Sequence, residues 1–231
     1  MPPSPLMPLR LFPWLTLLLA LTTACTPSQL ESVPEPVEGP EGISPEVWAH
    51  GLAAHRRATD LGLTSSQRIV IIDYTRASTE RRLWVVEIGT YEVLMHEYVA
   101  HAINSGGTYP YAFSNRDGSN RSSLGAFITG RPYIGIRGLA LRLEGLEPAI
   151  NNKAAARGIV FHGTPSVSEA RAAKGKMGRT QGCPAVPMKS IRKLVSLVRD
   201  GVLVFAWYPD KAFLAKSEFL DRTLAWANVT H

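Results

Sequence analysis

The stretch that decides the fold is residues 158–187, GIVFHGTPSVSEARAAKGKMGRTQGCPAVP. Its apolar start, residues 158–161, predicts a strand that ends at His162. Cys183 follows 21 residues after this histidine, between a glycine and a proline. A structural cysteine is more typical of the interior of a strand or helix, whereas this loop offers little side chain to bury one. The position makes Cys183 a candidate nucleophile.

The flanking sequence predicts a mainly β domain. Short runs rich in β-branched and aromatic residues alternate with breaks of Gly, Asn, Ser and Thr, which is typical of strands joined by turns. We expect strands at residues 68–74, 82–88, 91–99, 125–129, 140–143, 158–161 and 202–207. The roughly 185 residues after the N-terminal region suffice for one well-buried domain. The predicted fold is a β-sandwich or barrel with a few helices, its catalytic part covering residues 63–210.

Helices are expected at three places. Ser44 is a candidate cap for a helix over residues 45–62. Apolar residues recur at helical spacing over residues 191–198, behind Pro187, and residues 211–231 are expected to form a C-terminal helical extension. The second helix would place Cys183 on the loop that leads into it. There, free amide groups and the helix dipole favour a thiolate.

The N-terminus predicts export. Arg10 precedes the apolar run 11–23, which is shorter than the ~20 residues that a membrane span needs. Residues 1–24 therefore resemble a secretory signal. The sequence LTTAC at 21–25 resembles a lipobox, in which Cys25 becomes lipidated; ordinary cleavage and an uncleaved anchor are the alternatives. We expect a lipid-anchored protein in the periplasm or cell envelope, with Cys183 as its free thiol.

Charge separates the expected tether from the domain. Residues 25–44 are rich in Pro and Glu and predict an extended, disordered tether. Residues 25–50 carry five acidic and no basic side chains, whereas residues 51–231 carry 24 basic and 14 acidic ones. A basic exported domain suits an anionic polymer such as a cell wall, although a solvated surface without a partner is the alternative. The sequence contains no motif of aromatic and basic residues that would indicate stacking on nucleic-acid bases.

The histidine and the cysteine form a candidate catalytic pair. A thiol is only partly ionised at neutral pH and needs a base, for which His162 is the best-placed residue. The backbone amides of Gly182 and Cys183 are candidates for binding an oxyanion. Taken singly, a strand-end histidine and an inert cysteine are the alternatives. A zinc site that includes His101 is disfavoured, because structural zinc ligands come in characteristic spacings that are absent here.

These motifs resemble a known family. The HGT and TQGCPA sequences, preceded by SSLGAF at 122–127, are similar to the YkuD-type L,D-transpeptidases of bacterial cell walls, in their Gly-Cys-Pro-Ala subgroup. The resemblance covers about residues 67–208. It implies that Cys183 attacks the bond between the diamino acid and the terminal D-alanine of a tetrapeptide stem, forms a thioester and passes it to an amine, giving a 3-3 cross-link. His162 would act as base and later as acid.

The resemblance leaves other functions open. It implies peptidoglycan stem peptides as partners, and we also expect no cofactor or metal and a monomer. An L,D-carboxypeptidase or an amidase on the same scaffold would use water as acceptor. A lipid-anchored wall-binding protein without turnover is a second alternative. Sortases place the histidine and cysteine farther apart, and papain-like peptidases place them in the opposite order.

The resemblance also suggests substrate contacts. The hydroxyl of Thr180 would orient the loop or the substrate. Further candidates for substrate binding are His101, Ser123, Gly163, Gln181 and Arg179. Better-known members carry an aliphatic residue and an arginine after the cysteine, where this chain has Pro184 and Ala185. The basic residues left to hold a substrate carboxylate are Arg179, Arg171 and Lys176.

Overall fold

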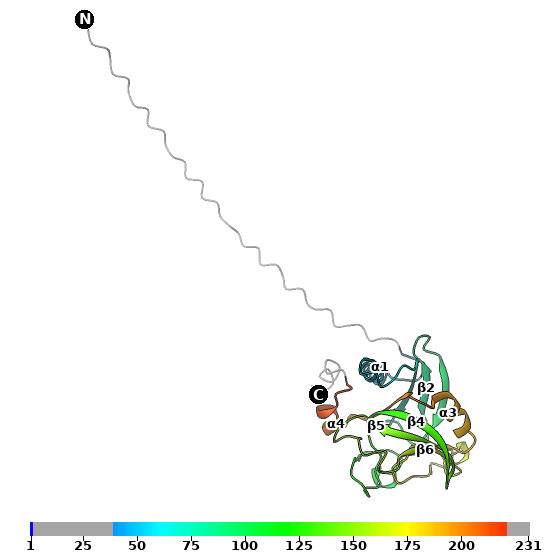
Figure 1. Cartoon of the computed structure of the whole chain (residues 1–231). Coiled ribbons are helices and arrows are strands. Elements are labelled where there is room, and N and C mark those ends of the chain that lie inside the picture. The colour runs from blue at the N-terminus through cyan, green and yellow to red at the C-terminus, as the bar shows by residue number, and fades with distance from the viewer. Residues whose placement is uncertain (2–38, 221–231) are drawn as a thin grey trace. The chain divides into compact units, whose positions relative to one another are not determined.

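Eight strands form one sheet in the computed structural model, which describes Met1 and residues 39–220 (Figure 1). The strands are β1 (Arg68–Asp73), β2 (Arg81–Glu87), β3 (Val93–Tyr98), β4 (Gly125–Gly135), β5 (Gly138–Gly145), β6 (Val160–Thr164), β7 (Ala185–Pro187) and β8 (Leu203–Trp207). The helices are α1 (Pro45–Asp60), η1 (a 3-10 turn, Ile103–Ser105), α2 (Glu169–Ala172), α3 (Ile191–Val198) and α4 (Lys211–Lys216).

The sheet curls until its two ends almost meet. Its strand order is β3-β2-β1-β8-β4-β5-β6-β7, with parallel pairing only for β1 with β8 and for β6 with β7 among the described strands. Just after β3, the amide of Ala100 donates to the carbonyl of Ala185 in β7 at 2.8 Å. This bond joins the first and last strands of the order. The predicted mainly β, barrel-like fold with few helices is confirmed.

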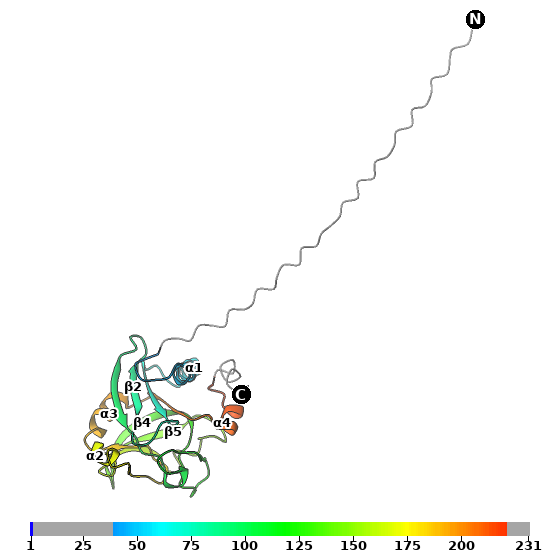
Figure 2. The same cartoon turned by 180° about the vertical axis from the view of Figure 1, so that it is seen from behind.

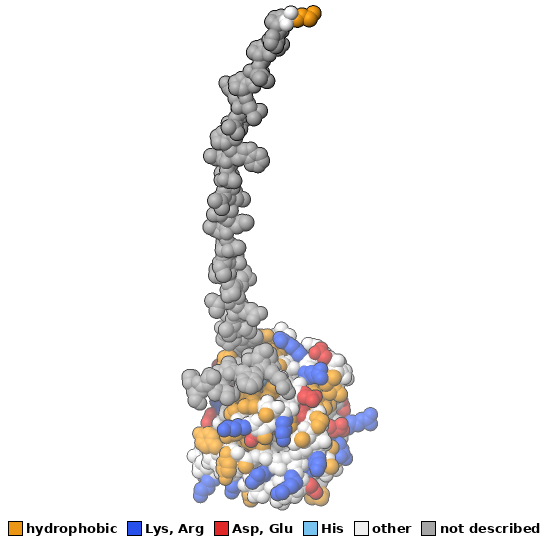
Figure 3. All heavy atoms as spheres, turned by 90° about the vertical axis from the view of Figure 1, so that its left-hand side faces the viewer, with side chains coloured by type: hydrophobic (Ala, Val, Ile, Leu, Met, Phe, Trp, Pro, Cys, Tyr) orange, Lys and Arg blue, Asp and Glu red, His pale blue; other side chains and the backbone are white. Residues whose placement is uncertain are grey.

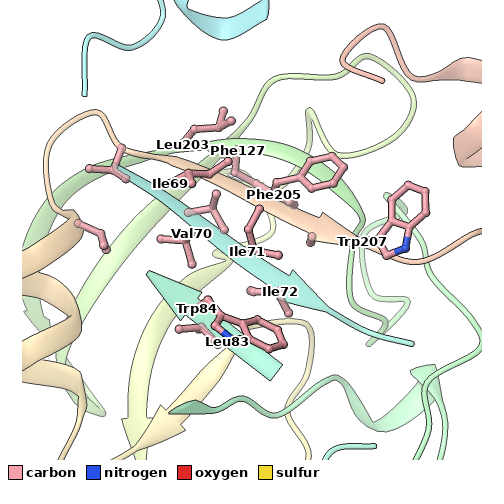
Figure 4. Close-up of a cluster of buried hydrophobic side chains, with 14 of the residues drawn as sticks. Ile69, Val70, Ile71, Ile72, Leu83, Trp84, Phe127, Leu203, Phe205 and Trp207 are labelled. Carbon is pink, nitrogen blue, oxygen red and sulfur yellow. The ribbon is translucent and has the colours of Figure 1, made fainter. Parts of the chain in front are cut away.

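The core is centred on β1. Ile69, Val70, Ile71 and Ile72 are at most 1% exposed, and Figure 4 shows them among buried side chains of β2, β4 and β8. A strand covered on both faces is apolar without alternation, as this one is. Helix α1, which is labelled in Figure 2, packs against β1 and β8. Gly51 allows this approach, because a Cβ atom there would lie 2.4 Å from Cδ1 of Ile71.

The folded part begins slightly before α1. The side chain of Ser44 accepts a hydrogen bond from the amide of Val47 at 3.3 Å, and proline occupies the first helical position. Ile43 and Trp48 are both buried. The described residues 39–44 thus belong to the packed domain, although they fall in the range expected for the tether. Residues 2–38, with the expected signal and Cys25, lie outside the described residues.

Most predicted elements have a counterpart, but several differ, and η1 and α2 were not predicted. Strand β4 continues to Gly135, beyond the predicted end at residue 129, and β7 was not expected. Of the expected C-terminal extension, Lys211–Lys216 is helical, residues 217–220 are not, and residues 221–231 lie outside the described part. No helix in the described part is both long and apolar enough to cross a membrane. Basic side chains are spread over the face seen in Figure 3.

Candidate active site

A pocket of about 340 Å³ contains both residues of the predicted catalytic pair. His162 reaches it from the middle of β6, which continues to Thr164 and does not end at the histidine as predicted, and Cys183 reaches it from the loop that precedes β7. The other residues that line it are Ile103, Arg137, Thr164, Ser166, Arg179, Thr180 and Gln181. The structure therefore brings His162 and Cys183 into one concave site.

Strand pairing explains why the two residues meet. Strands β6 and β7 run parallel, and His162 pairs with Ala185, two residues after Cys183. On the other side of the cysteine, Thr180 forms two backbone hydrogen bonds with the segment after β3. Its amide donates to one carbonyl at 3.0 Å, and its carbonyl accepts from one amide at 2.7 Å. The cysteine loop is thus fixed at both ends.

Cys183 does not lie at a helix N-terminus, contrary to the prediction. Helix α3 begins at Ile191, and β7 lies between it and the cysteine. The residues after Pro184 pair with β6 instead of starting a helix. The helix dipole therefore does not explain how the thiol would ionise, because its effect is confined to about one helical turn.

The tight turn before the cysteine requires glycine at position 182. Gly182 has a φ of 143°, a backbone angle that residues with a side chain rarely adopt. A Cβ atom there would also lie 2.6 Å from Cδ1 of Ile159. Both the backbone conformation and the close approach to Ile159, the residue before β6, disfavour a larger residue.

Thr180 organises this turn through its side chain. Its hydroxyl accepts from the amide of Gly182 at 3.2 Å and donates to the carbonyl of Cys183 at 2.7 Å. Of the two roles expected for this hydroxyl, the geometry favours orienting the loop. The amide of Gly182 is engaged in this bond, so the amide of Cys183 is the better candidate of the two for binding an oxyanion.

The thiol of Cys183 is held in its neutral form. It donates a hydrogen bond to the carbonyl of Gly158 at 3.5 Å. Burial raises its pKa above the ordinary value, and the amide of Val160 and the guanidinium groups of Arg137 and Arg157 oppose this rise only in part. The site thus holds a neutral thiol, which would have to lose its proton to act as a nucleophile.

His162 has the tautomer that suits a base. Its Nδ1 lies 3.1 Å from the carbonyl oxygen of Gly163. Since a carbonyl only accepts, Nδ1 carries the proton and Nε2 of the neutral ring is free to accept one. Burial lowers the pKa of His162, the Gly163 carbonyl raises it, and Arg137 lowers it further. The ring is therefore neutral near pH 7.

Gly163 was expected to contact substrate. In the structure, its backbone carbonyl accepts the hydrogen bond from Nδ1 of His162. Its side of β6 is closed, because a Cβ atom would lie 3.0 Å from Cγ2 of Ile191 and 3.1 Å from Sδ of Met188. It does not line the pocket, whereas Gln181 and Arg179 do. Arg171 and Lys176, the other candidates for a carboxylate, are exposed and lie outside the pocket lining.

His101 lies behind the pocket. Its ring is fully buried, and Nδ1 accepts a hydrogen bond from Nη2 of Arg82 at 2.9 Å. Burial, followed by Arg82, lowers its pKa to about 4. Its backbone carbonyl accepts the amide of Thr180, so it supports the cysteine loop. Residues 39–220 contain no group of three or more His, Cys, Asp or Glu side chains that would hold a metal ion.

Ser123 is also buried outside the pocket. Its hydroxyl accepts a hydrogen bond from Nη1 of Arg157 at 2.6 Å. Arg157 also donates to the carbonyls of Ser114 and Arg121, at 2.8 and 2.6 Å. Arg157 thus holds the segment before β4, and its Nη2 lies beside the cysteine loop, 3.4 Å from the Cβ position of Gly182.

Several pocket residues were not predicted from the sequence, and Arg137 is the most important of them. It sits at the turn between β4 and β5, about 25 residues before His162 in the chain. The pair Gly135 and Gly138 signals a hairpin turn there. Nothing in the sequence indicates that this turn reaches the cysteine. Ile103, Thr164 and Ser166 are the other additions.

Comparison with known proteins now decides the family. Residues 40–207 match the family model described as the L,D-transpeptidase catalytic domain. The chain belongs to the L,D-transpeptidase catalytic-domain family. This match covers most of the chain, including every strand and both residues of the candidate pair. No curated protein matches the sequence.

Solved structures of L,D-transpeptidases are similar to this member of the family at low identity. One from Mycobacterium smegmatis is 12% identical over 62% of this chain and 59% of its own, with a TM-score of 0.39. One from Xylanimonas cellulosilytica is 19% identical over 72% and 81%, with a TM-score of 0.37. A mutant from Enterococcus faecium is 10% identical over 62% and 50%, with a TM-score of 0.40. The chain thus spans half to three fifths of the first and third structures.

Proposed function

We propose that this protein is a cysteine-dependent peptidoglycan L,D-transpeptidase, with Cys183 as nucleophile and His162 as base. The observation that carries the proposal is the hydrogen bond from Nδ1 of His162 to the carbonyl of Gly163. It leaves Nε2 ready to accept a proton in the pocket that also holds the only cysteine of residues 39–220. Membership of the family supports peptidoglycan stem peptides as substrates.

The first half-reaction forms a thioester. Nε2 of His162 takes the proton of the thiol while Sγ of Cys183 attacks the carbonyl between the diamino acid and D-alanine. A sulfur–carbon bond forms, and the negative charge on the carbonyl oxygen is stabilised by the amide of Cys183. The carbon–nitrogen bond then breaks, and the imidazolium gives its proton to the leaving amine of D-alanine.

The second half-reaction resolves the thioester. The amine of a second stem peptide attacks the thioester carbonyl and loses a proton to Nε2 of His162. A carbon–nitrogen bond forms, the sulfur–carbon bond breaks, and the proton returns to the sulfur. Because both groups are neutral at rest, proton transfer accompanies each attack rather than preceding it.

Product analysis tests this function. The full-length protein is incubated with a disaccharide tetrapeptide, and the products are separated and weighed by mass spectrometry. A cross-linked dimer together with free D-alanine supports the proposal. A shortened peptide with no dimer supports the carboxypeptidase alternative, and an unchanged substrate supports a binding protein without turnover. His162→Ala should slow product formation by a factor of about 10² or more.

We propose that the protein is anchored outside the cytoplasm. The signal-like residues 1–24 and the lipobox-like sequence ending at Cys25 support this location. A lipid on Cys25 would hold the catalytic domain near a membrane, with the Pro- and Glu-rich residues 25–38 between them. The proposed oligomeric state is a monomer.

A further inference from the structure

Two arginines from distant parts of the chain line the candidate active site. Arg137 comes from the turn between β4 and β5, and Arg179 from the loop that leads to Cys183. The turn projects from the sheet, since Ile134 and Ile136 beside Arg137 are 78% and 107% exposed. The two arginines are therefore far apart in the sequence, and two separate elements, the hairpin turn and the loop before Cys183, place positive charge in one small pocket.

Neither arginine is neutralised by the described part of the protein. The ion pairs among residues 39–220 involve neither Arg137 nor Arg179. Arg179 donates from Nη1 to the carbonyl of Gly106 at 3.1 Å, which fixes its position and leaves its other donors available. Uncompensated guanidinium groups in a pocket attract carboxylates and bind them with charge-assisted hydrogen bonds.

Arg137 also acts on both reacting groups. It lowers the pKa of the thiol of Cys183 and the pKa of the ring of His162. An anion bound to Arg137 would therefore lie within electrostatic range of the sulfur. Since Arg137 lines the same pocket as His162 and Cys183, its guanidinium can contact a substrate bound there.

The sequence after the cysteine cannot provide a cation. Pro184 follows directly, and Ala185 and Val186 are fully buried where they pair with β6. Of the other cations proposed for this task, Arg171 and Lys176 lie outside the pocket. The charge therefore has to come from elsewhere in the fold.

We propose that Arg137 and Arg179 together bind a free carboxylate of the donor peptide, so that the turn between β4 and β5 determines specificity for anionic donors. This inference rests on the proposed function, because it names the group of the donor that the site selects. The turn of the hairpin then holds the carboxylate while His162 of β6 and Cys183 carry out the acyl transfer.

A pair of alkylating reagents tests the charge preference without any acyl transfer. Iodoacetate and iodoacetamide differ in carrying a carboxylate or a neutral amide, and alkylation of Cys183 in the full-length protein is followed by peptide mapping. We expect Arg137→Gln to lower the ratio of iodoacetate rate to iodoacetamide rate by about 10-fold, and added salt to lower it in the wild type. Arg131→Gln, an exposed arginine of β4 outside the pocket, should leave the ratio unchanged.

Peptide donors test the specificity itself. A tetrapeptide with a terminal carboxylate is compared with the same peptide as its amide. In the wild type, we expect the carboxylate form to have the lower KM, and Arg137→Gln to remove most of this difference, with a smaller change in kcat. Arg137→Lys should restore part of it, and Arg179→Lys should weaken it while keeping a positive charge.

Two results would overturn the inference. One is a wild-type protein that shows no preference for iodoacetate and no effect of Arg137→Gln on the rate ratio. The other is an equal loss for the Arg131→Gln control. If the alkylation preference is present but no peptide forms an adduct, the proposed function fails while the anion-binding pocket stands.

Discussion

At the scale of single residues, the candidate pair is neutral at rest. Burial raises the pKa of the Cys183 thiol and lowers that of the His162 ring. A thiolate–imidazolium pair would require the opposite shifts. In the proposed reaction, the thiol depends on Nε2 of His162 as general base, and the hydrogen bond from Nδ1 to the Gly163 carbonyl leaves this nitrogen free to accept the proton.

This state predicts a specific pH dependence. Only the thiolate is alkylated rapidly, and a raised pKa means that the thiolate fraction rises later with pH than for an ordinary cysteine. The rate of Cys183 modification by neutral iodoacetamide should have its midpoint above the usual value of about 8.5. Arg137→Gln should move the midpoint higher, because it removes a positive charge that favours the thiolate. A midpoint below the usual value would contradict the neutral resting pair.

Gly182 gives a second prediction at this scale. Gly182→Ala places a side chain on a backbone with a φ of 143° and within 2.6 Å of Cδ1 of Ile159. We expect a loss of stability of about 1–3 kcal/mol in chemical denaturation and a larger loss of acylation rate. Gly107→Ala is the matched control, since no atom lies within 4 Å of its Cβ position. Equal behaviour of the two variants would contradict the role assigned to the turn.

At the scale of elements, a buried carboxyl group joins β4 to the segment after α4. Glu147 accepts the amide of Ala126 at 2.7 Å through one oxygen and is hydrogen-bonded to the hydroxyl of Ser217 through the other. Burial raises its pKa in the folded state. Between its unfolded and folded pKa values, the folded protein binds more protons than the unfolded one.

The stabilisation from Glu147 should therefore be present at acidic pH and be lost as pH rises through the raised pKa. Glu147→Gln should flatten this dependence, because an amide keeps the acceptor for Ala126 without a charge. Glu147→Ala should cost about 1–3 kcal/mol, since the buried amide loses its partner. Urea denaturation at several pH values measures both effects. Glu144→Gln, an exposed change on β5, serves as control, and the same pH dependence in wild type and Glu147→Gln would contradict the prediction.

The strands show how much of the fold could be predicted. Apolar runs such as Ile69–Ile72 are unambiguous, because a central strand buried on both faces needs them. Strand β7 was missed because Ala185–Pro187 is too short for any pattern, and its pairing with β6 depends on the whole barrel. The helix over residues 191–198 was predicted correctly, but without β7 the residues between Cys183 and this helix were expected to be a loop leading directly into it.

The residues of the candidate site also divide into those that could be predicted from the sequence and those that could not. His162 and Cys183 could be predicted, because a histidine behind an apolar run and a cysteine in a Gly/Pro loop are local features, although His162 lies within β6 and not at its end. Arg137 could not, because its reach depends on the length of the hairpin and on a register shift between Thr129 and Pro132. His101 was expected near substrate from its place at a strand end, yet the curvature of the sheet buries it beside Arg82.

At the scale of the whole molecule, export and anchoring remain predictions from the sequence. If Cys25 is lipidated, the expressed protein should incorporate a labelled fatty acid and fractionate with membranes. Cys25→Ala should abolish both, while the catalytic domain keeps its alkylation behaviour at Cys183. Cleaved but unlabelled wild-type protein in the soluble fraction would indicate ordinary signal cleavage instead.

The most direct test of the whole account is the intact mass of the protein during reaction with a tetrapeptide donor. The account predicts that full-length protein gains the mass of the acyl tripeptide, that peptide mapping places it on Cys183, and that D-alanine is released in equal amount. Cys183→Ala should gain no mass, and His162→Ala should gain it much more slowly. A wild-type protein that remains unmodified while it cross-links or shortens the peptide, or an adduct on another residue, would contradict the assignment of Cys183 as nucleophile.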